Sequence, residues 1–268
     1  RDTDRSRGLG DVYKRQQEPV EISELETTEN NDLSKSSESI TVDESIAEDI
    51  LATQADTAVV VGTVSDYLTA KGDAKLYNIN LPAGVYLQAQ LTTPANADLD
   101  YDLYLLDAEG NILTGSDYYT YINGTAGTLP EALGYITSGD TATYYLYVLA
   151  SEGGSVSESF TLDYSVSTAC DSYEIDESVR QALAFTYGAG GAYIESRNLS
   201  SPIDNDWYVI TVPSSRIYDK LKISATTAST NTCSVEVYQN VASEGYQMKR
   251  VGSGNTISVL SLIHISEP

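Results

Sequence analysis

The sequence predicts an all-β protein built from antiparallel, jelly-roll-like β-sandwiches, and three observations carry this prediction. Short runs of alternating apolar and polar residues recur between turn signals, whereas a helical period is convincing nowhere beyond a turn or two. The chain has 21 Tyr against 2 Phe and 1 Trp, and Tyr suits a strand face that is half exposed to water. The sequence also repeats itself after about 130 residues, which indicates two units of one kind.

The alternating runs predict the strands of the first unit in chain order. The run at 75–81 ends at Pro82-Ala-Gly84, and the run at 100–107 is closed by Ala-Glu-Gly-Asn, so both end at residues that favour turns. The short spacing between runs favours a sandwich over alternating strand–helix units. We expect strands at 75–81, 85–93, 100–107, 141–151 and 159–167.

Both ends of the sequence resemble translated sequencing-adapter DNA rather than natural protein. The stretch SRGLGDVYKRQ at 6–16 matches one strand of such an element, and LSLIHISEP at 260–268 matches the other. We therefore interpret 1–16 and 260–268 as assembly scars and exclude them from fold reasoning. The acidic, Ser/Thr-rich segment 17–39 is nearly free of aromatic residues, which predicts a disordered leader.

Motif pairs in the same order define the repeat. TVDESIAEDILA (41–52) resembles EIDESVRQALAF (174–185), and GDAKLYNINLP (72–82) resembles IDNDWYVITVP (203–213). DLYLLD, which begins at Asp102, then aligns with SVEVYQ, which begins at Ser234. We expect a first sandwich at 40–168 and a second, truncated sandwich at 169–259.

These motifs resemble the bacterial pre-peptidase C-terminal (PPC) domain. That family opens on Tyr-Glu-Pro-Asn-Asp-Ser before a spaced alanine, and it continues with a central Asp-x-Asp-Tyr/Trp-Tyr strand and a later Asp-x-Asp-Leu-Tyr strand. Ile175 replaces the usual proline, Lys75 stands in the central motif of the first copy, and the second copy has Thr232 and Ser234 in place of the later aspartates. The matching stretches are Tyr173 to Ser178 with Ala182, Asp204 to Tyr208, Asp100 to Asp107 with Gly110, and Thr143 to Val148.

The resemblance implies tandem accessory domains that flank an extracellular enzyme, often a peptidase. Such domains are expected to serve in substrate attachment, secretion or maturation. Some relatives in clostridial collagenases are calcium-binding sandwiches, so the resemblance also keeps a calcium site open.

The stretch DLDYDLYLLDAE (98–109) has two interpretations. Asp98, Asp100, Asp102 and Glu109 stand at positions 1, 3, 5 and 12 of a helix–loop–helix calcium site, but position 6 is Leu103 where Gly is needed. The alternation instead predicts a strand that buries its leucines and exposes its aspartates. A surface calcium site at Asp98, Asp100 and Asp102 stays open, because a hard cation relieves repulsion between neighbouring carboxylates. No other cofactor is expected.

The second copy offers further candidates, each with a structural alternative. Asp204 and Asp206 suit a calcium site, although Asp204-Asn205 also suits a turn before the next strand. Trp207 and Tyr208 suit a platform for a sugar or peptide, or plain core packing. A disulfide between Cys170 and Cys233 would stabilise the fold by about 4 kcal/mol, and the alternative is that Cys233 is a small buried side chain.

Tyr118, Tyr119 and Tyr121 lie beside a Gly/Ser turn and are the candidates for an exposed aromatic contact patch. Their plain interpretation is an edge strand with Tyr on both faces.

The composition excludes several classes of function. The only histidine, His264, lies in the C-terminal scar, which leaves no Ser-His-Asp or Cys-His arrangement and no histidine-containing zinc site. A net charge of −24 disfavours nucleic acid and anionic membranes, and no apolar run approaches the roughly 20 residues of a membrane span. We therefore expect no enzyme, but an accessory or attachment module of a secreted or surface protein. Its partner is expected to be an extracellular protein or glycan polymer, or an attached catalytic domain; the alternatives are a structural spacer and a folding aid.

Overall fold

The computed structural model describes residues 38–39, 59–96, 98–117, 121–122, 125–126, 129–168, 170, 172–186, 199–211, 220–224, 235–240, 248–254 and 256–260. Within these ranges the regular elements are strands and no helix occurs, which confirms the all-β prediction. Accordingly, no helix there is long and apolar enough to cross a membrane.

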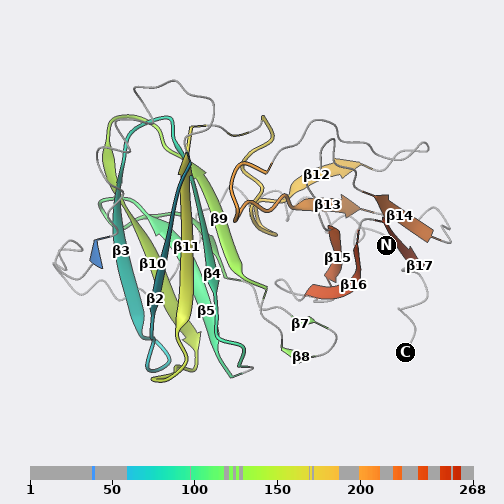
Figure 1. Cartoon of the computed structure of the whole chain (residues 1–268), viewed down its shortest axis with the longest axis horizontal. Coiled ribbons are helices and arrows are strands. Elements are labelled where there is room, and N and C mark those ends of the chain that lie inside the picture. The colour runs from blue at the N-terminus through green and yellow to red at the C-terminus, as the bar shows by residue number, and fades with distance from the viewer. Residues whose placement is uncertain are drawn as a thin grey trace, which may run out of the picture.

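One sheet of the first sandwich has five strands in the order β1-β3-β10-β5-β6 (Figure 1). β1 pairs in parallel with β3, and the other neighbours are antiparallel. β1 falls at the end of the segment for which we expected a disordered leader, so the expectation does not hold for these two residues. The strands are β1 Glu38–Ser39, β3 Ala74–Leu81, β5 Asp100–Leu106, β6 Ile112–Ser116 and β10 Ala142–Glu152.

The facing sheet has four antiparallel strands in the order β2-β11-β4-β9. The five strands predicted from the sequence correspond to β3, β4, β5, β10 and β11, and each lies within about one residue of its predicted bounds. The strands of this sheet are β2 Val59–Asp66, β4 Tyr86–Thr92, β9 Glu131–Ile136 and β11 Phe160–Ser167.

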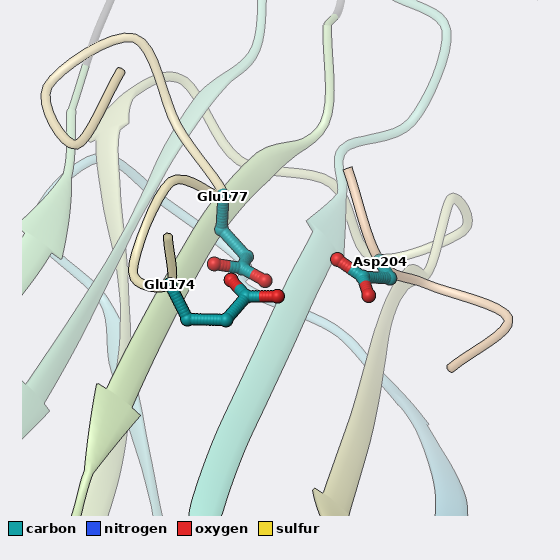
Figure 2. Close-up of side chains that lie close together, drawn as sticks. All are labelled: Glu174, Glu177 and Asp204. Atoms are coloured by element: carbon teal, nitrogen blue, oxygen red, sulfur yellow. The ribbon is translucent and has the colours of Figure 1, made fainter. Parts of the chain in front are cut away.

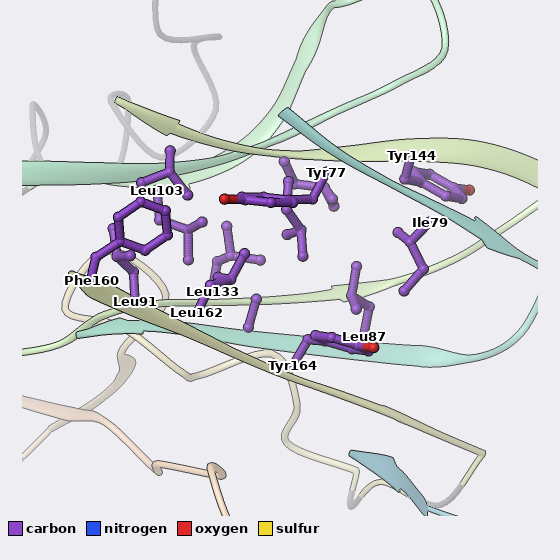
Figure 3. Close-up of a cluster of buried hydrophobic side chains, with 14 of the residues drawn as sticks. Tyr77, Ile79, Leu87, Leu91, Leu103, Leu133, Tyr144, Phe160, Leu162 and Tyr164 are labelled. Atoms are coloured by element: carbon purple, nitrogen blue, oxygen red, sulfur yellow. The ribbon is translucent and has the colours of Figure 1, made fainter. Parts of the chain in front are cut away.

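The core lies between the two sheets, and the period of two in each strand fills it (Figure 3). Tyr77 and Leu103 reach it from one sheet, and Leu87 and Leu162 reach it from the other, with each side chain at most 1% exposed. Burying a side chain of this size stabilises the fold by about 1.5–3 kcal/mol. The small number of Phe is offset by Tyr, which supplies much of the aromatic packing.

The outer face of β5 differs from the sequence-based expectation. Leu99, Tyr101, Leu103 and Leu105 do belong to the core, so the predicted sorting of the two faces is confirmed. The opposite face was expected to be wet, yet Asp102 is only 8% exposed. The reason is that neighbouring strands also present large apolar side chains on this face. The second cluster there consists of Tyr104, Leu106 and Tyr145, with Leu76, Ile112, Tyr147 and Leu149 packed against it.

The remaining strands lie mostly to the right of the sandwich in Figure 1 and form two-stranded sheets. β12 and β13 pair in parallel, whereas β14 with β17, β15 with β16 and β7 with β8 are antiparallel. That β12 to β17 belong to a second sandwich stays a prediction, whereas β7 and β8 fall within the range 40–168 expected for the first sandwich. Their bounds are β7 Tyr121–Ile122, β8 Thr125–Ala126, β12 Leu183–Thr186, β13 Tyr208–Thr211, β14 Lys220–Ser224, β15 Val235–Asn240, β16 Met248–Gly254 and β17 Thr256–Leu260.

Candidate metal centre

Residues 172–186, which we call the docking segment, contact the outer side of the first sandwich. The side-chain amide of Gln181 donates to the carbonyl of Gly134 in β9 at 2.9 Å, and the Gly134 N–H donates to Gln181 Oε1 at 3.1 Å. Arg180 forms an ion pair with Asp117, which follows β6. Side chains of the docking segment therefore bond to both backbone and side-chain groups of the first sandwich.

Backbone hydrogen bonds bring the acidic motif at 174–178 next to the motif at 204–208. The Trp207 N–H donates to the Asp176 carbonyl at 2.9 Å, and the Leu183 N–H donates to the Trp207 carbonyl at 2.8 Å. β12 and β13 then continue side by side in parallel. Because of this pairing, acidic side chains of two separate motifs meet at one place.

Five carboxylates converge there, and we call them the carboxylate cluster: Glu174, Asp176, Glu177, Asp204 and Asp206. They form two overlapping groups, one of Glu174, Glu177 and Asp204, the other of Glu174, Asp176 and Asp206. Within each group one oxygen from every side chain lies within 4.8 Å of the others. Figure 2 shows the carboxylates of Glu174 and Glu177 side by side, with that of Asp204 facing them.

Two members of the cluster are deeply buried and only partly satisfied. Glu177 is 1% exposed; its Oε1 accepts hydrogen bonds from the Tyr86 hydroxyl and from Gln88 Nε2 at 2.7 Å. Asp204 is 7% exposed, and its Oδ2 accepts the Ser200 N–H. Glu177 Oε2 and Asp204 Oδ1 have no hydrogen-bond partner among the described residues. A buried carboxylate oxygen without a partner is costly, so this arrangement favours a bound cation.

Burial and like charge act together on the cluster. The pKa of Glu177 is raised to about 7, chiefly by burial and also by the charges of Glu174 and Asp204, and this value includes the lowering effect of the hydrogen bonds from Gln88 and Tyr86. Burial also raises the pKa of Tyr86, and the neighbouring charges of Glu177 and Glu174 add to this. Tyr86 therefore remains a neutral donor to the two glutamates.

The donor set fits a hard divalent cation. Carboxylate oxygens are the ligands that Ca²⁺ and Mg²⁺ prefer, and the cluster offers no thiolate or imidazole that would select a softer metal. Each of the two groups of three side chains, which share Glu174, would offer such an ion a set of carboxylate ligands. Sequence reasoning named Asp204 and Asp206 as calcium candidates but missed Glu174, Asp176 and Glu177. The signal was available, because an acidic opening motif precedes an Asp-x-Asp motif in the same copy.

The residues predicted for a surface calcium site lie elsewhere, on and before β5. Asp98 is exposed, Asp100 is half-buried and Asp102 is buried. These three side chains belong to neither group of converging carboxylates found in the described ranges, and the calcium prediction for them stays a prediction. Burial raises the pKa of Asp102 to about 7, and the charges of Asp100 and Asp117 add to the shift.

The other candidates have mixed outcomes. The turn lies at 201–203, immediately before Asp204, rather than at Asp204-Asn205 as expected. Trp207 is half-buried and its ring lies 5.6 Å from that of Tyr238, measured between centroids. Cys170 is exposed, and Cys233 lies outside the described residues, so their disulfide stays a prediction. Tyr118, Tyr119 and the side chain of Tyr121 also lie outside the described part, and so does the proposed aromatic patch.

Comparison with known proteins gives weak likenesses only. No family profile matches the sequence, and no curated protein does. The chain is similar to the pre-peptidase C-terminal domain of a collagenase from Bacillus anthracis, with 15% identity over 40% of this chain and 89% of that chain and a TM-score of 0.27. PliG, a periplasmic inhibitor of g-type lysozyme from Aeromonas hydrophila, is similar with 10% identity over 40% of this chain and 85% of that chain and a TM-score of 0.26. The chain is also similar to the mitogen from Yersinia pseudotuberculosis, with 20% identity over 43% of this chain and 90% of that chain and a TM-score of 0.27. Likenesses at this level assign no function.

Proposed function

We propose that the chain is a non-catalytic accessory module of a secreted or surface-attached protein, and that it binds calcium in the carboxylate cluster. The observation that carries the calcium site is the pair of buried oxygens, Glu177 Oε2 and Asp204 Oδ1, that have no partner among the described residues. A cation would supply the missing interaction and also neutralise the repulsion between the carboxylates. When bound, the ion would supply positive charge, and the carboxylates of the cluster would supply its oxygen ligands.

Calcium is favoured over magnesium by the number and spacing of the donors. Calcium accepts 6–8 oxygen ligands in flexible geometry, whereas magnesium demands a near-ideal octahedron and keeps several waters. Two overlapping groups of three carboxylates, with ligand atoms as much as 4.8 Å apart within a group, suit the larger ion. Calcium sites of extracellular modules often have dissociation constants of about 10⁻⁴–10⁻³ M, and we expect a value in or below this range.

Matched details in the two halves support the proposal of tandem copies. Asp73 Oδ2 accepts the N–H of Thr69 at 2.9 Å, as Asp204 Oδ2 accepts the N–H of Ser200 four residues before it. The repeat aligns Asp73 with Asp204 and therefore Thr69 with Ser200. The hairpins β5–β6 and β15–β16 also share a feature, since their pairing shifts after Leu105 and after Val237, which are aligned positions.

The first copy does not offer the same donors. Lys75 stands at the position aligned with Asp206, and its Nζ lies 2.8 Å from Asp66 Oδ2 in an ion pair. A lysine amino group at this place supplies positive charge of its own and repels a metal ion. We therefore assign the calcium site to the second copy alone.

Calorimetric titration of the full chain with calcium tests the site. Wild type is expected to bind, and Glu177→Gln and Asp204→Asn are expected to lose most of the affinity because each removes one charged ligand. The matched control is Asp98→Asn, an exposed aspartate outside the cluster that belongs to the surface site predicted from the sequence. Loss of binding in Asp98→Asn with full binding in Glu177→Gln would move the site to β5, and absence of binding in wild type would refute the proposal.

The role as an attachment module is tested separately. The full chain is incubated with insoluble collagen, chitin and cell-wall glycan, with calcium or with a chelator. An attachment module is retained on at least one polymer, whereas a pure spacer is retained on none. Retention is expected to depend on both copies, because each contact is weak and linking two copies in one chain raises the effective concentration of the second.

A further inference from the structure

Side chains of the first sandwich form hydrogen bonds to the carboxylate cluster, whose five residues all belong to the proposed second copy. The Tyr86 hydroxyl, on β4 of the first sandwich, shares its single proton between Glu174 Oε2, at 2.8 Å, and Glu177 Oε1. Gln88, two residues further along β4, donates to Glu177 as well. The first sandwich therefore orients two of the proposed calcium ligands, although it contributes none of the five carboxylates.

The contact continues along the same face of β4. Tyr86, Gln88 and Gln90 alternate along the strand, and Gln90 Oε1 accepts a hydrogen bond from Asn205 Nδ2 at 3.0 Å. The Ser200 hydroxyl donates to Gln88 Oε1 at 3.5 Å. The outer face of an antiparallel sheet commonly faces water and carries such polar residues. Here Tyr86 and Gln88 are each only 1% exposed, because the second copy covers them.

Gly134 on β9 makes the close approach possible. A Cβ atom built on this residue would lie 2.5 Å from Glu177 Oε2 and 2.7 Å from Ile175 Cγ2. Both distances are shorter than real Cβ contacts, so with any larger residue at 134 the side chains of Glu177 and Ile175 would have to move. The backbone N–H and carbonyl of Gly134 both bond to Gln181 of the docking segment as well.

From these contacts we infer that calcium binding fastens the second copy to the outer face of β4 and β9, which makes the docking segment a calcium-dependent joint. The inference rests on the proposed calcium site. Without the ion, the five carboxylates repel one another while the first sandwich holds two of them in place, and separation relieves the repulsion. With the ion, the ligands are held together and the contact is stabilised. Linkage requires the converse: contacts made by Tyr86, Gln88 and Gly134 raise the affinity for calcium.

Hydrogen exchange at the Gly134 amide measures the contact directly, because this N–H donates to Gln181. In the full chain we expect this amide to exchange at least about tenfold more slowly in millimolar calcium than in a chelator. Calorimetry on the same samples measures calcium binding. An absence of binding overturns both the proposed site and the joint, whereas binding with unchanged Gly134 exchange overturns the joint alone.

Variants of the first sandwich provide the second readout. Gly134→Ala and Tyr86→Phe leave all five carboxylates intact, yet each is expected to weaken calcium binding by about tenfold or more. The matched control is Tyr144→Phe, which removes a hydroxyl from β10 in the other sheet and is expected to bind calcium like wild type. If Gly134→Ala fails to fold, the calcium affinity of Tyr86→Phe is the deciding measurement. An affinity for calcium in Tyr86→Phe equal to that of wild type overturns the inference.

Discussion

Replacing the buried Asp102 by Asn is expected to stabilise the protein at neutral pH and to lose this advantage in acid. Asp102 is 8% exposed on the outer face of β5, where the Tyr104 hydroxyl donates to it at 3.3 Å. Burial raises its pKa from 3.8 to about 7, with Asp100 and Asp117 adding to the shift. The folded state therefore keeps the proton over a pH range in which the unfolded chain has released it.

The sign and size follow from proton linkage. The pKa of Asp102 is higher in the folded state than in the unfolded state. Its protonation therefore contributes to the free energy of unfolding in full below about pH 4, and this contribution is lost as the pH rises through about 7. Each pKa unit corresponds to about 1.4 kcal/mol, so the loss across this window has a ceiling of about 4 kcal/mol. Asn carries no titrating proton and has nearly the same shape. The stability of Asp102→Asn relative to wild type should thus increase by up to a few kcal/mol from pH 4 to pH 8.

Urea unfolding of wild type and variant across this pH range provides the assay. Excess calcium is kept throughout, and wild type and variant are compared at the same pH, so that any pH dependence of the docking segment cancels in their difference. Asp98→Asn, at an exposed position ahead of β5, is the control and should show no comparable trend. A difference between wild type and Asp102→Asn that stays constant from pH 4 to pH 8 would refute the assignment of a buried, proton-retaining carboxyl.

The remaining predictions concern packing and charge. Leu133→Ala removes a fully buried side chain and should reduce the free energy of unfolding, measured by urea titration, by about 2–5 kcal/mol. The control is Val61→Ala, at a position 47% exposed, which should change the free energy of unfolding by less than about 1 kcal/mol. Gly62→Ala places a Cβ against the Tyr164 ring and should cost about 1–3 kcal/mol; the added Tyr164→Leu change should recover part of this, and an unchanged loss would contradict the contact. Because the net charge is −24, moderate NaCl should raise the thermal midpoint by screening self-repulsion, and a midpoint that falls with salt would contradict this.

Residue alternation predicted much of the first sandwich because each strand carries its own signal. Tyr101 and Leu103 were expected to point inward, and both are fully buried. The burial of Asp102 could not be predicted in the same way. Its exposure depends on aromatic side chains that other strands present on the outer face, such as Tyr147, and a single strand gives no information about its neighbours on that side.

The carboxylate cluster shows the same limit at longer range. Asp204 and Asp206 stand in one short motif, and their acidic spacing suggested calcium. Glu174 and Glu177 lie about 30 residues earlier, and they join the cluster only because β12 pairs with β13 and β4 holds their side chains. Contacts between separately coded motifs are set by the tertiary fold, so the local pattern indicated part of the site and missed the rest.

The single tryptophan gives this molecule a built-in optical probe. Trp207 exchanges backbone hydrogen bonds with the segment that carries the acidic residues, and its indole lies near the ring of Tyr238. Fluorescence excited at the red edge of the absorption band therefore originates from Trp207 alone, without a contribution from the 21 tyrosines. Ion-dependent rearrangement there is observable by intrinsic fluorescence without any attached dye.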